Sequence, residues 1–162
     1  MAHTKSSRTR GFTLIELLIA IAIIGALCAI AIPSYRSSAR SAQRAAAAAA
    51  LVDCSQKMER HYAQDMAYKG ASIGYGANTC VLPKSFASSY AASFVDAKGA
   101  SAGAVAGTDS YVLLATPTKG QSPDPCQALC IDSSGAKLAG APSGAGTTCA
   151  EIIPTAVAAS CW

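Results

Sequence analysis

The feature that most constrains the fold of this chain is a long apolar stretch close to its N-terminus. Between Leu14 and Ile32 every side chain except Glu16 is apolar or absent. A helix of roughly 20 residues at about 1.5 Å per residue matches the ~30 Å hydrocarbon core of a bilayer. Three basic residues precede the stretch, namely Lys5, Arg8 and Arg10. The positive-inside bias therefore predicts a membrane-spanning helix with its N-terminus in the cytoplasm and the rest of the chain beyond the membrane.

Glu16 is the one charged residue of this stretch. A carboxylate on a membrane helix costs about 2.5 to 3.5 kcal/mol at the bilayer centre and less near an end. Because the stretch contains no Lys or Arg, we expect a counter-charge from another chain or from an N-terminus created by cleavage. The alternative is a carboxyl group close enough to the headgroups to be solvated or protonated.

The residues around Glu16 form a recognisable signal. A basic leader, Gly11, Phe12, Thr-Leu-Ile-Glu and an apolar helix closed by Pro33 resemble the class III signal of type IV pilins and related pseudopilins. The resemblance implies that a prepilin peptidase cleaves between Gly11 and Phe12 and that Phe12 is then N-methylated. It also implies that Glu16 meets the N-terminal ammonium of a neighbouring subunit during filament assembly. The competing interpretation is an ordinary secretory signal, because Ala29 to Ala31 has the small-x-small form of a signal-peptidase site.

Composition limits the remaining function classes. The formal net charge of +4 is mostly due to the leader. Without the leader, basic and acidic residues nearly balance, so composition gives no support to a general nucleic-acid binder. Residues 34–162 are enough for one modest domain, which covalent cross-links would help to stabilise.

Cysteine usage favours an oxidising compartment. Cys28 lies in the apolar stretch, where we expect it to pack as a small apolar residue. The other six read as a disulfide framework: Cys54, Cys80, Cys126, Cys130, Cys149 and Cys161. In an extended chain Cys126 and Cys130 are about 13 Å apart, beyond the ~7 Å that a disulfide allows. Their candidate partners are Cys149 and Cys161, in an order left open, and Cys54 with Cys80 forms the third pair. A zinc site is the weaker alternative, because neither a Cys-x-x-Cys pair nor a neighbouring His is present.

The apolar helix is predicted to continue outside the membrane. Neither Gly nor Pro occurs between Pro33 and Gly70, and residues 45–50 are all alanine. Pro33 removes one helical hydrogen bond and Gly25 weakens the helix, so a kink is expected at these positions. Four residues share one helical face and are expected to pack on a head domain: Leu51, Cys54, Met58 and Tyr62.

A basic stripe lies on the same predicted helix. Arg36, Arg40 and Arg44 recur every four residues. We expect them to contact lipid phosphates before assembly, or acidic groups of neighbouring subunits afterwards. A DNA-reading stripe is the alternative.

Beyond a loop at residues 70–89, the pattern changes to short strands. They are predicted at residues 90–95, 111–115, 128–131 and 136–138, with a turn at 132–135, and their short connections indicate an antiparallel meander. The run from Tyr111 through Gln121, Asp124 and Cys126 to Lys137 resembles the sheet of minor pilins of the PilE and ComP type. In that family a Gly usually follows the first cysteine, whereas Gln127 follows it here. The tail from Gly140 is Gly, Ala and Ser rich, and a terminal bridge with Trp162 as an aromatic plug would hold it.

Together these features predict an α+β protein with the type IV pilin fold, a long N-terminal helix packed on an antiparallel sheet. The expected organisation is a leader (1–11), a transmembrane and filament-core helix (12–33), an amphipathic continuation (34–68) and a disulfide-bonded head (69–162). An enzyme is disfavoured, because His61 is the one histidine after the leader and the sequence points to neither an oriented acid nor a nucleophile beside it. No cofactor or metal is expected.

The predicted function is that of a structural minor subunit of a type IV pilus, supporting biogenesis, adhesion, twitching motility or DNA uptake. The implied partners are other pilins, the prepilin peptidase and N-methyltransferase, the assembly machinery, the inner membrane, and DNA or a host surface. The implied location is the inner membrane and then the extracellular filament. One alternative is a DNA-binding competence pilin with four candidate contacts, Lys84, Lys98, Lys119 and Lys137. Another is a type II secretion pseudopilin, although the sequence lacks an acidic calcium loop.

Overall fold

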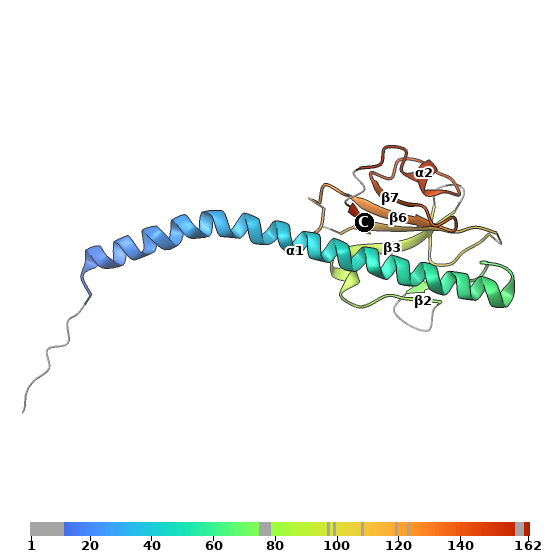
Figure 1. Ribbon diagram of the computed structural model, residues 1–162, viewed down its shortest axis with the longest axis horizontal. Helices are drawn as coiled ribbons and strands as arrows, with labels where there is room; N and C mark the ends of the chain where they lie inside the picture. The colour runs from blue at the N-terminus through green and yellow to red at the C-terminus, as the bar shows by residue number, and fades with distance from the viewer. Residues whose placement is uncertain are drawn as a thin grey trace, which may run out of the picture. The chain divides into compact units, whose positions relative to one another are not determined.

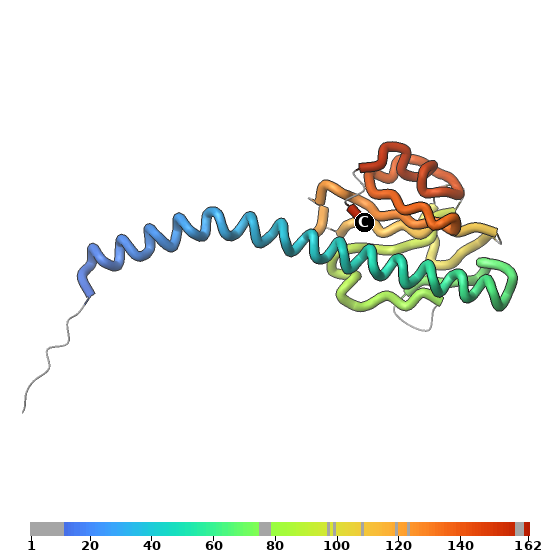
Figure 2. The backbone as a smooth tube through the Cα atoms, viewed as in Figure 1, coloured from blue at the N-terminus to red at the C-terminus, as the bar shows by residue number. Residues whose placement is uncertain are grey.

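The computed structural model describes residues 12–74, 79–96, 98, 100–107, 109–118, 120–122, 124–157 and 161–162. The chain forms two compact units, Met1–Ala39 and Arg40–Trp162. Figure 1 traces the chain from its N-terminal helix to the C-terminal strands, and Figure 2 follows the same backbone as a tube. Each unit is described separately below.

Helix α1 spans Leu14–Asp65 and contributes to both units. In the first unit, the described side chains from residue 12 to 38 are all exposed. Within the described residues, α1 is the one helix long and apolar enough to cross a membrane. Pro33 lies inside α1, and helix is assigned on both sides of it. The helix ends before the expected boundary at residue 68, because Met66 adopts a left-handed φ of 53° and donates its N–H to the carbonyl of Tyr62.

The second unit, called the head below, contains a five-stranded antiparallel sheet in the order β4-β3-β5-β6-β7. Its strands are β3 (Tyr90–Val95), β4 (Ser101–Ala102), β5 (Val112–Pro117), β6 (Ala128–Asp132) and β7 (Lys137–Gly140). Pairing of Phe94 with Leu113, and of Leu113 with Ile131, fixes the register across its centre. The predicted antiparallel meander is confirmed, although most strand ends differ by one or two residues.

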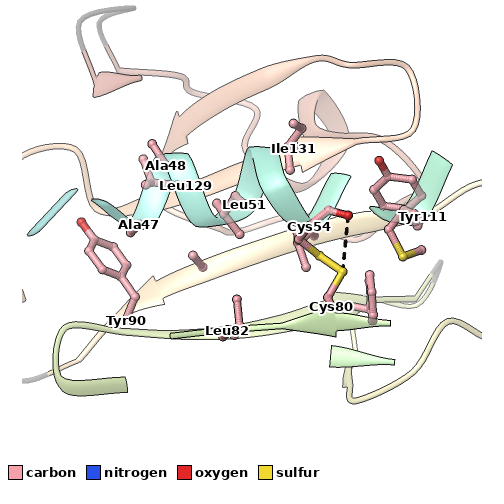
Figure 3. Packing of buried hydrophobic residues seen from close by; sticks show 14 of the residues in the cluster. Ala47, Ala48, Leu51, Cys54, Cys80, Leu82, Tyr90, Tyr111, Leu129 and Ile131 are labelled. Atoms are coloured by element: carbon pink, nitrogen blue, oxygen red, sulfur yellow. Dashed lines mark hydrogen bonds between the residues drawn. A yellow bond between two sulfur atoms is a disulfide. The ribbon is translucent and has the colours of Figure 1, made fainter. Parts of the chain in front are cut away.

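One face of the sheet packs against the head portion of α1. Leu51, Cys54 and Met58 are buried in one cluster with Tyr90, Leu113 and Leu129. Figure 3 labels Leu51, Cys54, Tyr90 and Leu129 of this cluster. Tyr62 is half-buried at the edge of this cluster. The predicted packing stripe is therefore confirmed, because its 3.6-residue spacing directs these side chains to one side of the helix.

The other face of the sheet is also covered, which the sequence did not suggest. Helix α2 (Cys149–Ile152) lies in the C-terminal region and begins with a capping box between Thr148 and Glu151. Ile152 and Ile153 pack with Val112 and Leu114 in a second cluster. Alternate residues of a strand point to opposite faces, so β5 is buried on both sides.

The expected loop at residues 70–89 contains regular structure. Strands β1 (Ile73–Gly74) and β2 (Cys80–Val81) pair in parallel, and a short 3-10 helix, η1, spans Phe86–Ser88. Phe86 and Leu82 are buried in the cluster beneath α1. The prediction of a plain loop was therefore wrong, because a few apolar residues anchor a segment whose composition is dominated by Gly, Ser and Ala.

Three disulfides cross-link the head. Cys54 bonds Cys80, Cys126 bonds Cys161, and Cys130 bonds Cys149, with Cα separations of 5.0, 5.7 and 5.7 Å. The first is the pair expected from the sequence, and the other two resolve the order that it left open. Cys28 is free and exposed.

Candidate functional site

The first candidate site is the start of α1. Thr13 precedes the helix, and its backbone N–H and hydroxyl donate to Glu16 Oε2 over 3.1 and 3.0 Å. In return, the Glu16 N–H donates to the Thr13 hydroxyl over 3.3 Å. This reciprocal arrangement is a capping box, in which residues three apart satisfy the free amides of the helix start. Thr13 thus supplies two hydrogen bonds to Glu16 but no positive charge, so a counter-charge from another chain or from a cleaved N-terminus stays a prediction.

The residues around this cap are open to the surroundings. Phe12 is 89% exposed, and Leu14 is 77% exposed. Gly11, the other half of the predicted cleavage site, lies outside the described residues. The hydrogen bonds from Thr13 are uncharged at the donor, so the negative charge of Glu16 has no ionic partner within the described chain. The start of α1 thus presents an aromatic residue, an apolar surface and an unneutralised carboxylate together.

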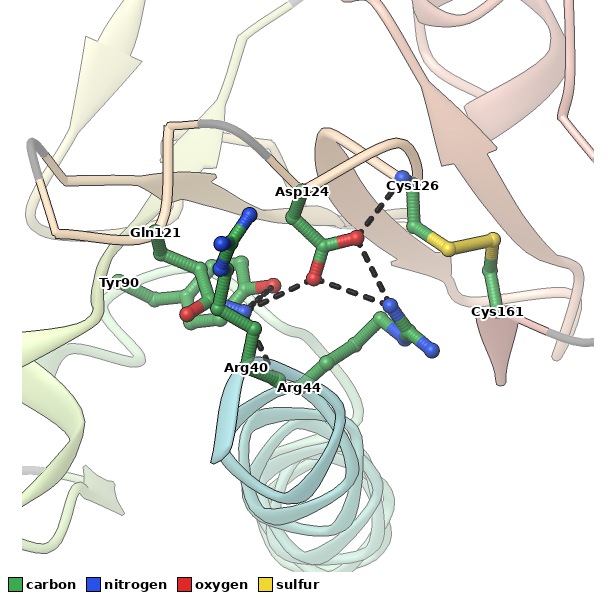
Figure 4. Close-up of polar contacts among 7 residues, drawn as sticks. All are labelled: Arg40, Arg44, Tyr90, Gln121, Asp124, Cys126 and Cys161. Atoms are coloured by element: carbon green, nitrogen blue, oxygen red, sulfur yellow. Dashed lines mark hydrogen bonds and ion pairs between the residues drawn. A yellow bond between two sulfur atoms is a disulfide. The ribbon is translucent and has the colours of Figure 1, made fainter. Parts of the chain in front are cut away.

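The second candidate site is a group of polar contacts between α1 and the loop before β6, made by Arg40, Arg44, Gln121 and Asp124 and called the clasp here (Figure 4). Arg44 Nη1 lies 2.8 and 3.0 Å from the two carboxylate oxygens of Asp124. The Asp124 side chain is fully buried, and that of Arg44 is 17% exposed. Gln121 Nε2 donates to the Arg40 carbonyl and to Asp124 Oδ2, both over 2.8 Å.

The clasp is continuous with a disulfide. The backbone N–H of Cys126 donates to Asp124 Oδ1 over 2.9 Å, and Cys126 is bonded to Cys161. A buried carboxylate is costly unless it is paired and hydrogen-bonded, and both conditions are met by these donors. The clasp therefore links one helical turn of α1 to a covalently fixed loop.

The clasp was not recognised as a site in the sequence. Arg44 was expected to face lipid or neighbouring subunits, and this was wrong, because its partner is Asp124 of the same chain. Arg36 is exposed and Arg40 is half-exposed, and their contact with lipid or neighbouring subunits stays a prediction. In the sequence, Gln121 and Asp124 are distinguished only by their place in the run that resembles minor pilins. The i, i+4 spacing of Arg40 and Arg44 indicates that they share one helical face, and Asp124 lies two residues before Cys126. The sequence does not show that Arg44 and Asp124 are in contact.

A third group of contacts lies near the C-terminal end of α1. The hydroxyls of Tyr68 and Tyr111 both donate to Glu59, over 3.0 and 3.4 Å, and Tyr111 also donates to Ser55. The rings of Tyr68 and Tyr111 meet edge to face with centroids 4.9 Å apart. Burial raises the pKa of Tyr111 to about 12, and burial together with Glu59 raises the pKa of Tyr68. These tyrosines therefore fasten the helix end and remain protonated at neutral pH.

The lysines predicted as DNA contacts come from separate connections of the head. Lys84 precedes η1, Lys98 lies in the turn after β3, and Lys137 begins β7, and all three are exposed. Lys119 lies outside the described residues. The ammonium of Lys137 is 5.7 Å from the centroid of the Trp162 ring, whose indole N–H donates to the Leu138 carbonyl. Lys84, Lys98 and Lys137, the three of these lysines that the structure describes, thus lie on different elements of the head.

His61, the one histidine after the leader, lies on α1. His61 Nδ1 lies 3.2 Å from Asp65 Oδ2, an i, i+4 contact along the helix. No group of three His, Cys, Asp or Glu side chains in the described part of the chain is placed to hold a metal ion. The polar contacts described above cap and anchor α1.

An apolar N-terminal helix whose second half packs on an antiparallel, disulfide-linked sheet defines the class of type IV pilins. The family model described as "Type IV minor pilin ComP, DNA uptake sequence receptor" matches residues 33–130. A second model, the prokaryotic N-terminal methylation motif, matches residues 6–32. The chain therefore belongs to the ComP family of type IV minor pilins. The methylation motif and the apolar helix fit a protein that resides in the inner membrane and then in the pilus filament.

Two further similarities concern individual pilins. Over 37 residues the chain is 65% identical to the type IV major pilin protein PilA of Myxococcus xanthus strain DK1622, a match that covers 22% of this chain and 17% of that protein. The chain is also similar to the high-resolution structure of a type IV pilin from Shewanella oneidensis. There the identity is 24% and the TM-score 0.41, over 60% of this chain and 89% of the other.

Proposed function

We propose that this protein is a structural minor subunit of a type IV pilus that enters the fibre through residues 12–33. The observation that carries this proposal is the apolar start of α1, which is exposed throughout residues 12–33 in the single chain and contains one carboxylate. Exposed apolar surface of this extent requires lipid or another protein to cover it. Assembly exchanges lipid contacts for packing between helices of neighbouring subunits, and this role calls for no catalytic residue.

The capping box suggests how Glu16 takes part in assembly. Thr13 holds the Glu16 carboxylate at the first turn of α1, beside Phe12. Cleavage after Gly11 would create an ammonium on Phe12, and a charge-assisted contact is roughly twice as strong as a neutral hydrogen bond. We infer that Glu16 keeps the hydrogen bonds that Thr13 donates to it while it also accepts a hydrogen bond from the Phe12 ammonium of an adjoining subunit. The leader (1–11), the assembly helix (12–33) and the head would then have separate roles.

The mature N-terminus provides the test of this proposal. Mass spectrometry of the protein recovered from the membrane is expected to find a chain that begins at N-methylated Phe12. A peptidase-deficient strain is the control and should retain residues 1–11. A mature protein that begins after Ala31 would identify an ordinary secretory signal and contradict the proposal.

Location separates the pilus from the secretion alternative. Mechanical shearing of cells is expected to release the protein with surface fibres. Recovery from the periplasm alone, together with loss of protein export on gene deletion, would identify a pseudopilin instead. The control is a soluble periplasmic protein, which should be absent from the sheared fraction.

A second candidate function, DNA binding during uptake, is favoured by the ComP family model over residues 33–130. The contacts proposed for the phosphate backbone are Lys84, Lys98, Lys119 and Lys137.

Binding through a few phosphates would weaken as the salt concentration rises. The slope of log binding constant against log salt concentration would be close in size to the number of contacts. Titration of the full chain in detergent with duplex DNA tests this, and Lys84→Ala with Lys98→Ala should lower the slope by about 2. Lys57→Ala is the control, because Lys57 is paired with Asp53. No binding at low salt would exclude this function.

A further inference from the structure

The clasp lies at the point along α1 where contacts with the rest of the head begin. The described side chains from residue 12 to 38 are exposed, and the head unit begins at Arg40. The first buried side chain of α1 is Ala47. Along the helix, the contacts of Arg40 and Arg44 with Gln121 and Asp124 therefore come just before the packed core.

The helix on the N-terminal side of the clasp has little support of its own. Pro33 has no N–H, so the carbonyl of Ala29 lacks its helical partner. Gly25 costs about 1 kcal/mol relative to alanine within a helix. Helices without tertiary packing are marginal in water. Where neither lipid nor a neighbouring subunit covers these residues, opening of α1 is therefore easiest before Arg40.

The clasp resists the spread of that opening. Gln121 binds the carbonyl of Arg40 at one end of a helical turn, and Asp124 binds the side chain of Arg44 at the other end. Unwinding this turn would draw Arg44 away and leave the buried carboxylate of Asp124 without its positive partner, a change that strongly destabilises proteins. The loop side cannot follow the helix easily, because Asp124 is bound to the amide of Cys126 and Cys126 is disulfide-bonded to Cys161.

We propose that the clasp is a stop that confines unwinding of α1 to the residues before Arg40. The proposal rests on the proposed function in a pilus. Tension along a fibre would act on the chain between the helix embedded in the fibre and the head. Under tension the segment before the clasp would extend first, and the head would keep its fold while Arg44 and Asp124 carry the load. Asp124, Gln121 and Arg44 are therefore positioning residues, whose role is to keep α1 helical from Arg40 onward.

Hydrogen exchange of the full chain in detergent micelles tests the stop, with mass spectrometry resolving peptides of α1. In the unmodified protein, amides at residues 34–39 should exchange fast and those from Arg44 onward slowly. Asp124→Asn should speed exchange at residues 44–48 about tenfold or more and leave Leu51 to Tyr62 unchanged. The matched control is Asp53→Asn, which removes an exposed ion pair of the same helix with Lys57 and should change neither region.

Two results would overturn the proposal. One is unchanged exchange at residues 44–48 in Asp124→Asn. The other is a uniform rise through α1 and the sheet, which would show that Asp124 supports the whole head and sets no boundary. Gln121→Leu provides a second variant that leaves the ion pair in place, and its effect should be smaller and confined to the turn from Arg40 to Arg44. The measurement needs no fibre, so failure to assemble would bear on the proposed function alone.

Discussion

The two units of this protein share helix α1 but differ in how much of its surface is buried. Up to Ala39, α1 exposes its apolar side chains and has no cross-link to the rest of the chain, with Cys28 left free. From Arg40 onward, the same helix is buried against a sheet, and three disulfides fix the surrounding chain. The head thus contains the interactions that stabilise its own fold, whereas the first unit depends on lipid or other subunits.

This difference separates stability from assembly. Substitutions in the head should change the free energy of unfolding and leave the processing of the N-terminus intact. Substitutions near Glu16 should change assembly and leave the unfolding of the head intact.

Removal of the Cys54–Cys80 disulfide should have the largest effect on the head. The double variant Cys54→Ala with Cys80→Ala opens a loop spanning a separation of 26 residues and should lower the unfolding free energy by about 3.5 kcal/mol. Chemical denaturation of the full chain in detergent measures the change. Cys28→Ala is the control and should have no effect on the head. Equal stability of the double variant and the parent would contradict the role of this cross-link.

Loss of the carboxylate in the clasp should rank second. Asp124→Ala leaves Arg44 partly buried without a partner and Gln121 without one acceptor, so a loss of about 3 kcal/mol is expected. The same denaturation experiment measures it, and Asp53→Ala serves as the exposed control, with an expected change below about 1 kcal/mol. Similar losses of unfolding free energy in the two variants would contradict the prediction that the buried ion pair contributes more to stability than the exposed one.

A methyl group at residue 144 should disturb the C-terminal region. A Cβ atom at Gly144 would meet the carbonyl group of Glu151, a backbone atom that cannot turn aside. Gly144→Ala should therefore destabilise the head by about 2 kcal/mol, detected as a lower midpoint of thermal unfolding. Gly103→Ala is the matched control, because nothing lies near its Cβ position. A neutral Gly144→Ala would indicate that this loop does not pack on α2.

Alkaline pH should weaken the head through Tyr111. Its pKa is raised to about 12 by burial, against roughly 10 in an unfolded chain. The unfolded state therefore loses the proton first, and stability present below pH 10 falls as the pH rises toward 12, by on the order of 1 kcal/mol after solvent screening. Unfolding followed as a function of pH measures this loss. Tyr111→Phe should be less sensitive over the same range, and an identical profile would rule out this contribution.

The smallest effect should be a gain in stability. Gln127 has a φ of 53°, a conformation that suits glycine better than other residues. It occupies the position where the resembling pilins usually have Gly, so the departure noticed in the sequence coincides with local backbone strain. Gln127→Gly should stabilise the head by about 0.5 to 1 kcal/mol, measured by denaturation. Its control, Gln56→Gly in α1, should destabilise by about 1 kcal/mol. A destabilised Gln127→Gly variant would contradict this explanation.

Periodic and local signals made much of the fold predictable. The helix face with Leu51 and Met58, the strand at residues 90–95 and the turn after Asp132 all depend on residues close in sequence. Long-range contacts were harder. The burial of β5 on two faces depends on α2, whose four residues lie in a tail with little periodicity. In the clasp, Arg44 contacts Asp124, which is 80 residues further along the chain. Neither composition nor local periodicity predicts a contact over that separation. Glu16 was noticed at once, but its hydrogen bonds to Thr13 required the helix start to be placed.

The central claim is that the exposed start of α1, with its one carboxylate, is the part through which subunits join. Incorporation of Glu16→Val into sheared surface fibres, compared with the parent protein at equal membrane levels, tests it most directly. We predict that the variant is retained in the inner membrane, with a head as stable as that of the parent, and is lost from the fibres. Equal amounts of variant and parent in the fibres would contradict the claim.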